Sequence, residues 1–338
     1  MGSSERHAER RRLRWRRAVG ALAALGVGSC IELAPVAEEP DASDGCPQPV
    51  LKAAAVIATG QAQPFAVLAA GDEIWWSNED GGAMRAAADG NDVTSIGLPQ
   101  GISRITGLRL DADHLYLSAY YSGAILRAPR SGSAASVWVD GQYAIGLALD
   151  AEHVYWPDDV ASAIRRGAKS ASAPVTPETV ATGQADPRFI TLDATHVYWT
   201  TKVGGVRRKA KAGGEVEPVA EAPPGSEVWD LVVDDAPDGF VYWRDGNAVV
   251  GRVMRARKSG AALTVLAELE PGPRLLALDG AYLYWTGNTS QSVSRVPVAG
   301  GCKELVVTAQ PGAHGIAVNA THLFWTSWTL GTISRTVK

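Results

Sequence analysis

The chain has 338 residues, 46% of them hydrophobic and 20% charged, which is ordinary for a globular protein with a sizeable core. Its formal net charge is −4, and loss of residues 1–29, which hold seven Arg and two Glu, would change that charge to −9. So acidic a chain lacks the basic footprint of a nucleic-acid-binding protein, and we expect no nucleic-acid partner.

The first 29 residues have the layout of a secretory signal peptide. A basic head contains seven arginines, and the uncharged run 18–29 that follows is too short to span a membrane. Residues 27–30, Val-Gly-Ser-Cys, resemble the bacterial lipobox, in which the cysteine is lipidated and becomes the new N-terminus. We therefore predict lipidation of Cys30. The alternatives are an ordinary signal peptide with an incidental Cys30, and export by the twin-arginine route.

The segment after the lipobox predicts a tether. Ile31 is not the acidic residue that retains many lipoproteins at the inner membrane, so we expect an outer-membrane anchor, on the periplasmic or the surface side. Residues 30–49 are rich in Ala, Pro and acidic residues without periodicity, which is typical of a flexible linker. No long apolar run follows, so we expect an exported monomer that contacts the membrane only through its lipid.

From residue 50 onward the chain repeats one unit. A strand that pairs an aromatic residue with Trp, or with Leu117 in the second copy, recurs at steps of 39 to 44 residues, and its seven copies begin at Glu73, His114, His153, His196, Phe240, Tyr282 and His322. A period near forty with strand-like repeats is typical of a β-propeller with one blade per repeat. The sequence therefore predicts an all-β fold, a seven-bladed β-propeller over residues 50–338.

Each repeat predicts four strands in the same order. A strand of small apolar residues, such as residues 145–150, precedes the Tyr-Trp strand, whose consecutive apolar positions suit a blade that is covered on both faces. A third strand carries an apolar residue and a base, and a Gly-rich hairpin such as Gly300-Gly301 leads to the outermost strand, for example residues 304–307.

The last repeat supplies only three strands before the chain ends at Lys338. Residues 54–60 resemble the outer strand at 305–310 and precede the first inner strand. Pairing residues 52–59 beside residues 331–337 would close the ring and remove an exposed edge. We therefore predict a three-plus-one closure, with the N-terminal strand completing the last blade.

This repeat resembles the YWTD propellers of low-density-lipoprotein receptors, and it is similar to secreted propeller lipoproteins of the kind common in myxobacteria. The resemblance covers residues 52–338. It departs from the receptor class in two ways, because those propellers have six blades and because the Asp after the motif is present only as Asp158 and Asp245. The receptors' partner sites are therefore not transferred.

Two further cysteines are available for a disulfide if Cys30 takes lipid. Cys302 follows the Gly-rich hairpin of its repeat, and Cys46 lies just before the closing strand of the adjacent blade. An oxidising compartment favours their pairing. The alternative is two free thiols.

The histidines divide into two groups. Four of them occupy one repeat position directly after the inner-strand turn, which indicates an architectural role: His114, His153, His196 and His322. His314 is the exception, because its counterparts differ in every other blade.

The loops from an outer strand to the next inner strand open beside the central channel, where propellers usually bind ligands. We call this opening the channel mouth. Aligning the inner strands places there Gln63, Arg104, Tyr143, Arg188, Glu227, Arg274 and His314. Three arginines in an acidic protein predict a site for a carboxylate, a phosphate or an acidic glycan. The alternative is a polar, hydrated mouth without a ligand.

The sequence has few of the residues and motifs that known propeller enzymes use for catalysis. Residues 311–316, Pro-Gly-Ala-His-Gly-Ile, resemble a phrase of the streptogramin lyases, but the Glu-x-His pair of those metal-dependent enzymes is missing from residues 50–338. Lactonase propellers cluster carboxylates in the channel, and here only Glu227 and Asp230 are available. Standard hydrolase and metalloprotease motifs are also missing, and we predict no metal and no cofactor.

We therefore predict a non-catalytic envelope lipoprotein whose propeller binds a small anionic or glycan ligand or an envelope protein. The second hypothesis is a lyase- or lactonase-type enzyme that uses His314, Glu227 and the arginines. A third is a purely structural member of an envelope complex.

Overall fold

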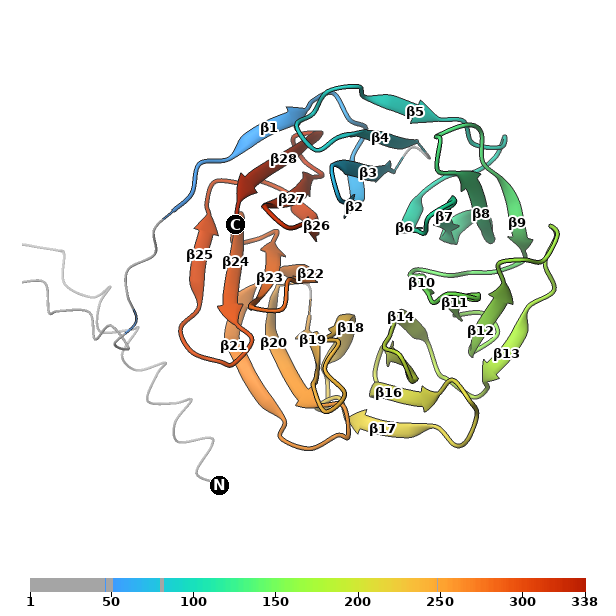
Figure 1. The fold of residues 1–338 in the computed structure, drawn as a ribbon. Coiled ribbons are helices and arrows are strands. Elements are labelled where there is room, and N and C mark those ends of the chain that lie inside the picture. The colour runs from blue at the N-terminus through green and yellow to red at the C-terminus, as the bar shows by residue number, and fades with distance from the viewer. Residues whose placement is uncertain (1–45, 47–50, 80–81, 248) are drawn as a thin grey trace, which may run out of the picture. The chain divides into compact units, whose positions relative to one another are not determined.

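The repeats form seven four-stranded antiparallel sheets arranged around a central axis (Figure 1). The computed structural model describes residue 46 and residues 51–79, 82–247 and 249–338. The predicted signal peptide (1–29), the lipidation site Cys30 and most of the predicted tether (30–49) lie outside the described residues. The seven-bladed propeller predicted from the period is thus confirmed.

The two inner strands of each blade carry the small apolar segment and the Tyr-Trp segment. The innermost strands are β2 (Pro64–Ala70), β6 (Ile105–Leu110), β10 (Ala148–Leu149), β14 (Pro187–Leu192), β18 (Glu227–Val233), β22 (Pro273–Leu278) and β26 (Ala313–Val318). The second strands are β3 (Glu73–Asn78), β7 (His114–Ala119), β11 (His153–Asp158), β15 (His196–Thr201), β19 (Phe240–Gly246), β23 (Tyr282–Gly287) and β27 (His322–Ser327).

The two outer strands complete each blade. The third strands are β4 (Ala83–Ala87), β8 (Ala124–Pro129), β12 (Ala163–Ala168), β16 (Gly205–Ala210), β20 (Val250–Arg257), β24 (Ser292–Pro297) and β28 (Thr332–Val337). The outermost strands are β5 (Thr94–Ile96), β9 (Ser136–Asp140), β13 (Glu178–Ala181), β17 (Glu217–Ala220), β21 (Thr264–Pro271), β25 (Glu304–Val307) and β1 (Ala55–Ala58). A short 3-10 helix, η1 (Tyr120–Ser122), follows β7. No helix in the described part of the chain is long and apolar enough to cross a membrane.

The ring closes as the sequence predicted. Strand β1 pairs antiparallel with β28, with Ala55 opposite Arg335 and Val56 opposite Ser334, so the N-terminal strand becomes the outer strand of the last blade. Figure 1 shows β1 beside β28 on the rim of the ring. The closure hides the edge that β28 would otherwise expose to pairing with another chain.

A disulfide joins Cys46 to Cys302, with a Cα–Cα separation of 5.6 Å. The two thiols are therefore paired rather than free. Nearby, the backbone N–H of Lys52 donates to the carbonyl of Val306 in the outer strand of blade 6 at 2.8 Å. The segment before β1 is thus fastened to blade 6, while β1 itself belongs to blade 7. Both contacts restrain the strand that closes the ring.

The repeated Trp is buried between blades and has its indole N–H satisfied. Trp156 and Trp199 are fully buried, and each donates from Nε1 to the side-chain oxygen of a glutamine, Gln142 and Gln184, at 3.0 Å. Each glutamine follows the outer strand of the preceding blade. The Trp therefore contributes a large apolar surface and also holds the connection between blades in place.

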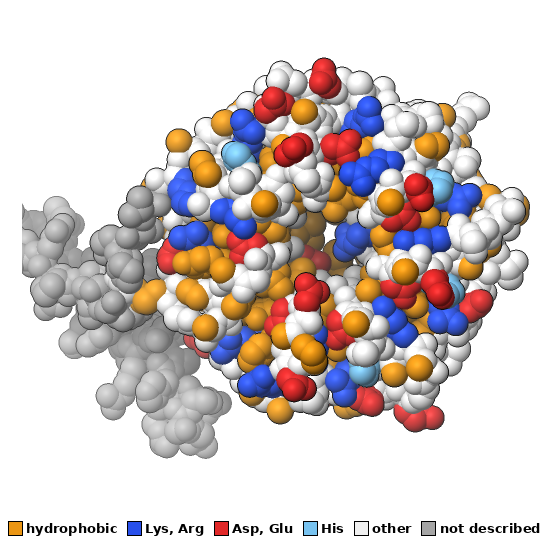
Figure 2. Space-filling view, viewed as in Figure 1, with side chains coloured by type: hydrophobic (Ala, Val, Ile, Leu, Met, Phe, Trp, Pro, Cys, Tyr) orange, Lys and Arg blue, Asp and Glu red, His pale blue; other side chains and the backbone are white. Residues whose placement is uncertain are grey.

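An aspartate after each of five inner strands organises the turn below it. Asp193 accepts hydrogen bonds from the backbone N–H of Thr195 and His196 and from the hydroxyl of Tyr198. Lys258 of the next blade completes the site with a 3.0 Å ion pair to Asp193. Figure 2 shows acidic and basic side chains intermixed on this face of the ring. Three of the histidines at the repeat position, His114, His153 and His196, lie in these turns, and His322 lies in the corresponding turn after Asn319.

The hydroxyl that follows the repeated Trp ties neighbouring inner strands together. Thr326 Oγ1 accepts from the backbone N–H of Gly315 in its own blade at 2.8 Å and donates to the carbonyl of Phe65 in the next blade at 3.1 Å. Serine or threonine occupies this position in five blades: Ser77, Ser118, Thr200, Thr286 and Thr326. Blade 3 has Pro157 there, and blade 5 has Arg244.

Candidate binding cavity at the channel mouth

A cavity of about 320 Å³ occupies the channel at the mouth. Every blade contributes to its lining, and the central channel is also visible as a hollow in Figure 2. The lining residues are Phe65, Glu79, Arg104, Ile105, Thr106, Tyr120, Tyr121, Ile145, Arg188, Phe189, Glu227, Trp229, Arg244, Arg274, Leu275 and His314. Its volume is at the lower end of the range for small-molecule sites, and its mixture of aromatic and charged side chains is typical of them.

Irregular pairing at the start of the inner strands decides which side chains enter the cavity. Six of the described inner strands shift register there, for example between Pro273 and Leu276 in β22. Such a bulge places an extra residue between paired positions and redirects the side chain that it carries. In β22 the residues within the shift are Arg274 and Leu275, and both line the cavity.

The strand register also shows that the residues aligned from the sequence as equivalent occupy two different positions along the inner strands. Counted from the residue that pairs with the repeated Trp or its equivalent, the mouth residues fall two or four places earlier. Those two places earlier are Arg188, Arg274 and His314, and those four places earlier are Gln63, Arg104, Tyr143 and Glu227. The second position lies on the rim, where the chain turns into the strand with positive φ at Gln63 and Arg104.

The structure places Arg104, Arg188, Glu227, Arg274 and His314 in the lining of one cavity. Tyr143 is not in that lining, so its predicted place there is corrected. Its side chain is 37% exposed and packs edge-on against the ring of Tyr120, with centroids 6.4 Å apart. The Tyr143 ring lies beside Gly123 and Tyr120 in the loop after β7 instead of entering the channel. Gln63 is likewise outside the lining.

The charges at the rim are compensated by partners. Arg104 pairs with Glu79 at 2.5 Å, and Lys202 pairs with Glu227 at 3.3 Å. Glu227 also accepts a hydrogen bond from the indole N–H of Trp229 at 3.2 Å. These pairs leave little net charge at the rim.

Arg188 is partly buried but has two carboxylates beside it. Its guanidinium lies 2.5 Å from Asp186 and 3.8 Å from Asp159. Burial opposes the charged form, yet the hydrogen bond to Asp186 and the charges of both carboxylates raise the pKa of Arg188. Asp159 also accepts from the hydroxyl of Tyr120, and burial together with this bond raises the pKa of Tyr120 to about 12.

Arg244 and Arg274 differ, because no carboxylate among the described residues lies within ion-pair distance of either guanidinium. Arg244 is only 6% exposed, and the Nε atoms of both residues are buried without a hydrogen-bond partner. Burial, together with the nearby charge of Arg274, lowers the pKa of Arg244 to about 10, and burial also lowers the pKa of Arg274. Arg244, which is buried, and Arg274, which is partly buried, therefore face the cavity without an ion-pair partner among the described residues, although the more distant charges of Asp230 and Glu227 favour the charged form of Arg244.

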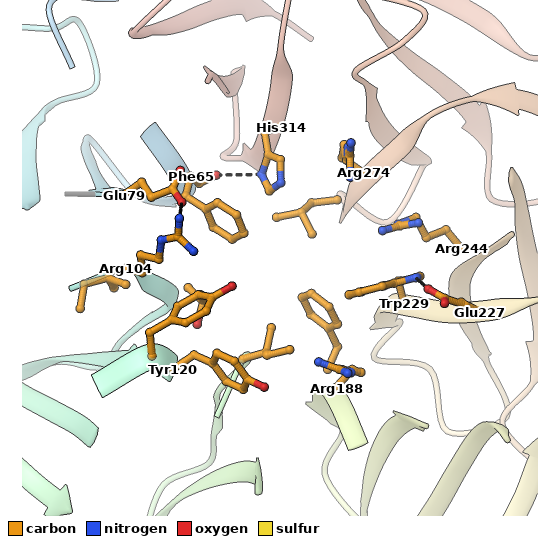
Figure 3. Close-up of a pocket in the computed structure, with 16 residues that line it drawn as sticks. Phe65, Glu79, Arg104, Tyr120, Arg188, Glu227, Trp229, Arg244, Arg274 and His314 are labelled. Atoms are coloured by element: carbon orange, nitrogen blue, oxygen red, sulfur yellow. Dashed lines mark hydrogen bonds and ion pairs between the residues drawn. The ribbon is translucent and has the colours of Figure 1, made fainter. Parts of the chain in front are cut away.

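The indole ring of Trp229 supports two of the arginines, Arg244 and Arg188. The guanidinium carbons of Arg244 and Arg188 lie 5.2 and 5.7 Å from the ring centroid of Trp229, and Phe189 packs against the same indole. Figure 3 shows Trp229 and Arg244 on one side of the cavity and Phe65 and Tyr120 on the other. Stacking of this kind stabilises a cation by about 0.5–2 kcal/mol, which is less than a full ion pair in a buried site.

His314 is neutral at physiological pH. Burial, with smaller contributions from the charges of Arg274 and Arg244, lowers its pKa to about 4. Its Nδ1 lies 3.2 Å from the carbonyl oxygen of Phe65, which can only accept, so Nδ1 carries the proton. The ring also packs on Phe65, with centroids 4.2 Å apart (Figure 3). Nε2 is therefore left with a lone pair.

A further charged pair lies in the channel. Asp230 accepts a 2.7 Å hydrogen bond from the backbone N–H of Leu276, and burial raises its pKa to about 6 against the opposing effects of that bond and of Arg109 and Arg244. Burial in turn lowers the pKa of Arg109, while Asp230 raises it. Arg109 and Asp230 thus compensate each other in large part.

The sequence prediction missed Arg244, Trp229, Phe65 and Phe189. A usable signal existed for Arg244, because it replaces the hydroxyl residue that five other blades have after the repeated Trp or its equivalent. No comparable signal marked the aromatic residues, whose direction depends on the register shift. In the described part of the chain, no cluster of three or more His, Cys, Asp or Glu side chains has the geometry of a metal site.

Comparisons with known proteins agree on the fold. No protein-family model and no curated protein sequence matches the chain. Among solved structures, virginiamycin B lyase from Staphylococcus aureus has a TM-score of 0.72 at 13% identity and covers 85% of this chain and 98% of its own. A streptogramin B lyase gives 0.71 at 11% identity, covering 84% and 97%.

A third match is a structure of a nidogen–laminin complex, with a TM-score of 0.50 at 20% identity, covering 62% of this chain and 83% of the matched chain. This neighbour contains a YWTD-type propeller. At these identities the likeness establishes the propeller fold alone, and the matches include both enzymes and binding proteins.

Proposed function

We propose that this protein is a non-catalytic binding propeller, and that its channel mouth binds a small anionic ligand. The observation that carries the proposal is the pair Arg244 and Arg274, whose Nε atoms are buried beside the cavity and which have no carboxylate within ion-pair distance in the described part of the chain. An uncompensated buried charge costs several kcal/mol, on the order of 3–5 when a partner is removed. Such a cost is typical of functional sites, where a bound anion supplies the missing partner.

We also propose the cellular setting predicted from the N-terminus. The chain is an exported lipoprotein, anchored through Cys30 to the outer membrane, and its propeller is of the YWTD type found in secreted myxobacterial lipoproteins. The basic head, the short apolar run and the lipobox support this setting. The Cys46–Cys302 disulfide supports an oxidising compartment. Incorporation of labelled palmitate that disappears in Cys30→Ser would test the anchor.

The ligand proposal is tested with the full chain carrying Cys30→Ser, so that lipid does not interfere. Melting temperature is measured against carboxylates, phosphate esters and uronic acids. Binding to the folded state stabilises it by about 2.7 kcal/mol at a hundred times Kd, so at least one anion class raises the melting temperature. The shift disappears in Arg274→Gln and persists in Arg208→Gln, a matched control because Arg208 pairs with Glu217 on the outer strands. No shift with any anion contradicts the proposal and favours a protein partner.

One observation favours the second candidate, a lyase- or lactonase-type enzyme. His314 is neutral and has a lone pair at Nε2, as a general base requires. A catalytically inactive His-to-Ala variant of virginiamycin B lyase, solved with quinupristin, is among the similar structures. Release of acid from cyclic esters that is lost in His314→Asn would support this function. Ligand binding without turnover supports the binding propeller.

A further inference from the structure

Two of the arginines around the cavity have no carboxylate within ion-pair distance among the described residues. Arg104 is compensated by Glu79, Arg188 by Asp186 and Asp159, and Glu227 by Lys202. In the channel, Arg109 and Asp230 offset one another. His314 is neutral. The remaining charges belong to Arg244 and Arg274.

These two arginines act as a pair. The charge of Arg274 is close enough to disfavour the charged form of Arg244, so the two cations repel one another across the cavity wall. Figure 3 shows Arg274 and Arg244 next to each other on the side formed by blades 5 and 6. A single anion between them would receive hydrogen bonds from both guanidinium groups, including the Nε atoms that now lack partners. A doubly charged anion would also remove the repulsion.

The opposite side of the cavity is apolar. Blades 1 to 3 contribute Phe65, Ile105 and Ile145 there, together with the ring of Tyr120. The charges near this wall are paired, Arg104 with Glu79 at 2.5 Å and Asp159, beside Tyr120, with Arg188 at 3.8 Å. Apolar and aromatic walls of this kind favour a hydrophobic ligand body, at about 25 cal/mol per Å² of buried surface. The cavity is thus divided into a dicationic side and an apolar side.

We infer that the ligand is an amphipathic dianion, with a doubly charged head between Arg244 and Arg274 and a compact apolar body against Phe65 and Ile145. This inference rests on the proposed binding function and specifies its ligand class. A phosphate monoester and a dicarboxylate both supply the head, because a phosphate monoester carries nearly two charges above its second pKa of about 6. The volume of about 320 Å³ limits the body to a small ring system or a short chain.

The test measures dissociation constants at pH 7.5 by calorimetry on the full chain with Cys30→Ser. Phenyl phosphate and benzylmalonate combine a dianion with an apolar ring. Benzoate has the ring and one charge, while inorganic phosphate and malonate have two charges without a ring. We expect phenyl phosphate or benzylmalonate to bind at least tenfold more tightly than each of the other three, and the better of the two identifies the head group.

Three variants locate the site. Arg244→Thr and Arg274→Gln each weaken the preferred dianion at least tenfold and reduce its advantage over benzoate. Arg208→Gln changes neither quantity by more than about twofold, because Arg208 lies outside the cavity lining and pairs with Glu217 on the outer strands. Circular dichroism and the melting temperature of the unliganded variants establish that each is folded. Arg244→Thr is the safest of them, since threonine is the residue at this position in three other blades.

The outcomes separate the two proposals. If benzoate binds as tightly as phenyl phosphate, and Arg274→Gln still weakens binding, the ligand need not be a dianion. The proposed anion-binding function then stands, and the dianion inference is wrong. Inorganic phosphate binding as tightly as phenyl phosphate overturns the apolar body. Failure of every probe to bind overturns the proposed function itself.

Discussion

Blades 7 and 5 contain the same four strands, but they treat one position differently. In blade 7, Thr326 joins Gly315 of its own inner strand to Phe65 of the next blade, and its side chain is fully buried. In blade 5 that position holds Arg244, whose guanidinium faces the cavity, while Asp230 takes over the contact to the next blade by accepting from Leu276. In blade 7 this position provides hydrogen bonds that hold two inner strands together, whereas in blade 5 it holds a buried charged side chain.

In a repeat protein, functional residues are expected at positions where one blade departs from the repeat. Residues that recur at one place in every blade satisfy the architecture, as Trp199 and Gln184 do. A departure that adds an energetic cost, as Arg244 does, needs a compensating benefit.

Replacing a repeated Trp should damage the fold, whereas replacing the cavity Trp should damage binding. Trp199→Ala removes a fully buried side chain and is expected to cost about 3–5 kcal/mol in the free energy of unfolding. Trp229→Ala, at the partly buried cavity position, should cost only about 1–2 kcal/mol, yet weaken the ligand more than tenfold. Urea denaturation and calorimetry measure the two effects. Equal losses of stability would contradict the distinction.

Two channel residues should give opposite pH dependences. Between about pH 4 and 6.5 the unfolded chain protonates His314 but the folded chain does not, so stability falls as pH decreases through this window. For Asp230 the folded chain holds the proton between about pH 4 and 6, so stability falls as pH rises. Each effect is at most about 3 kcal/mol.

Urea denaturation from pH 4 to 8 separates them. His314→Asn removes the loss of stability on the acid side, and Asp230→Asn removes the loss toward neutral pH. The double variant should show neither slope. Parallel pH profiles for wild type and both single variants would show that these groups titrate normally.

Restoring the repeat in blade 5 should stabilise the protein. Arg244→Thr removes a buried charge whose lowered pKa of about 10 reflects its unfavourable surroundings, although it also removes the stacking on Trp229. The net gain is expected to be about 2 kcal/mol, together with the loss of ligand binding. Arg244→Met serves as the control, because it removes the charge without offering a hydroxyl. A destabilised Arg244→Thr would mean that the arginine is structural.

The smallest effect concerns the regular blade. Thr326→Val keeps the shape but removes the hydroxyl that bonds to Gly315 and Phe65. Because Phe65 retains a hydrogen bond from His314, the cost should be about 1 kcal/mol. Thermal denaturation measures it. Ligand affinity should stay within about twofold of wild type, and a larger change would show that this contact also positions the site.

The sequence determined the architecture by itself. The period of the Tyr-Trp strand, the missing outer strand of the last repeat and the similar strand before the first one predicted seven blades and their closure, because these features are local patterns repeated along the chain. The same reasoning brought Cys46 close to Cys302, now a disulfide. It also assigned the four repeated histidines to architecture.

Only the tertiary structure decided the site. A register shift decides which side chains face the channel, so the alignment did not identify Phe189 and Trp229, which lie within such shifts, as cavity residues. Nor could it tell which charges are paired. Asp245 follows Arg244 directly, yet it pairs with Arg252 at 2.6 Å, since adjacent residues of a strand point to opposite sides. Charge compensation depends on distances between blades, and these exist only once the ring has closed.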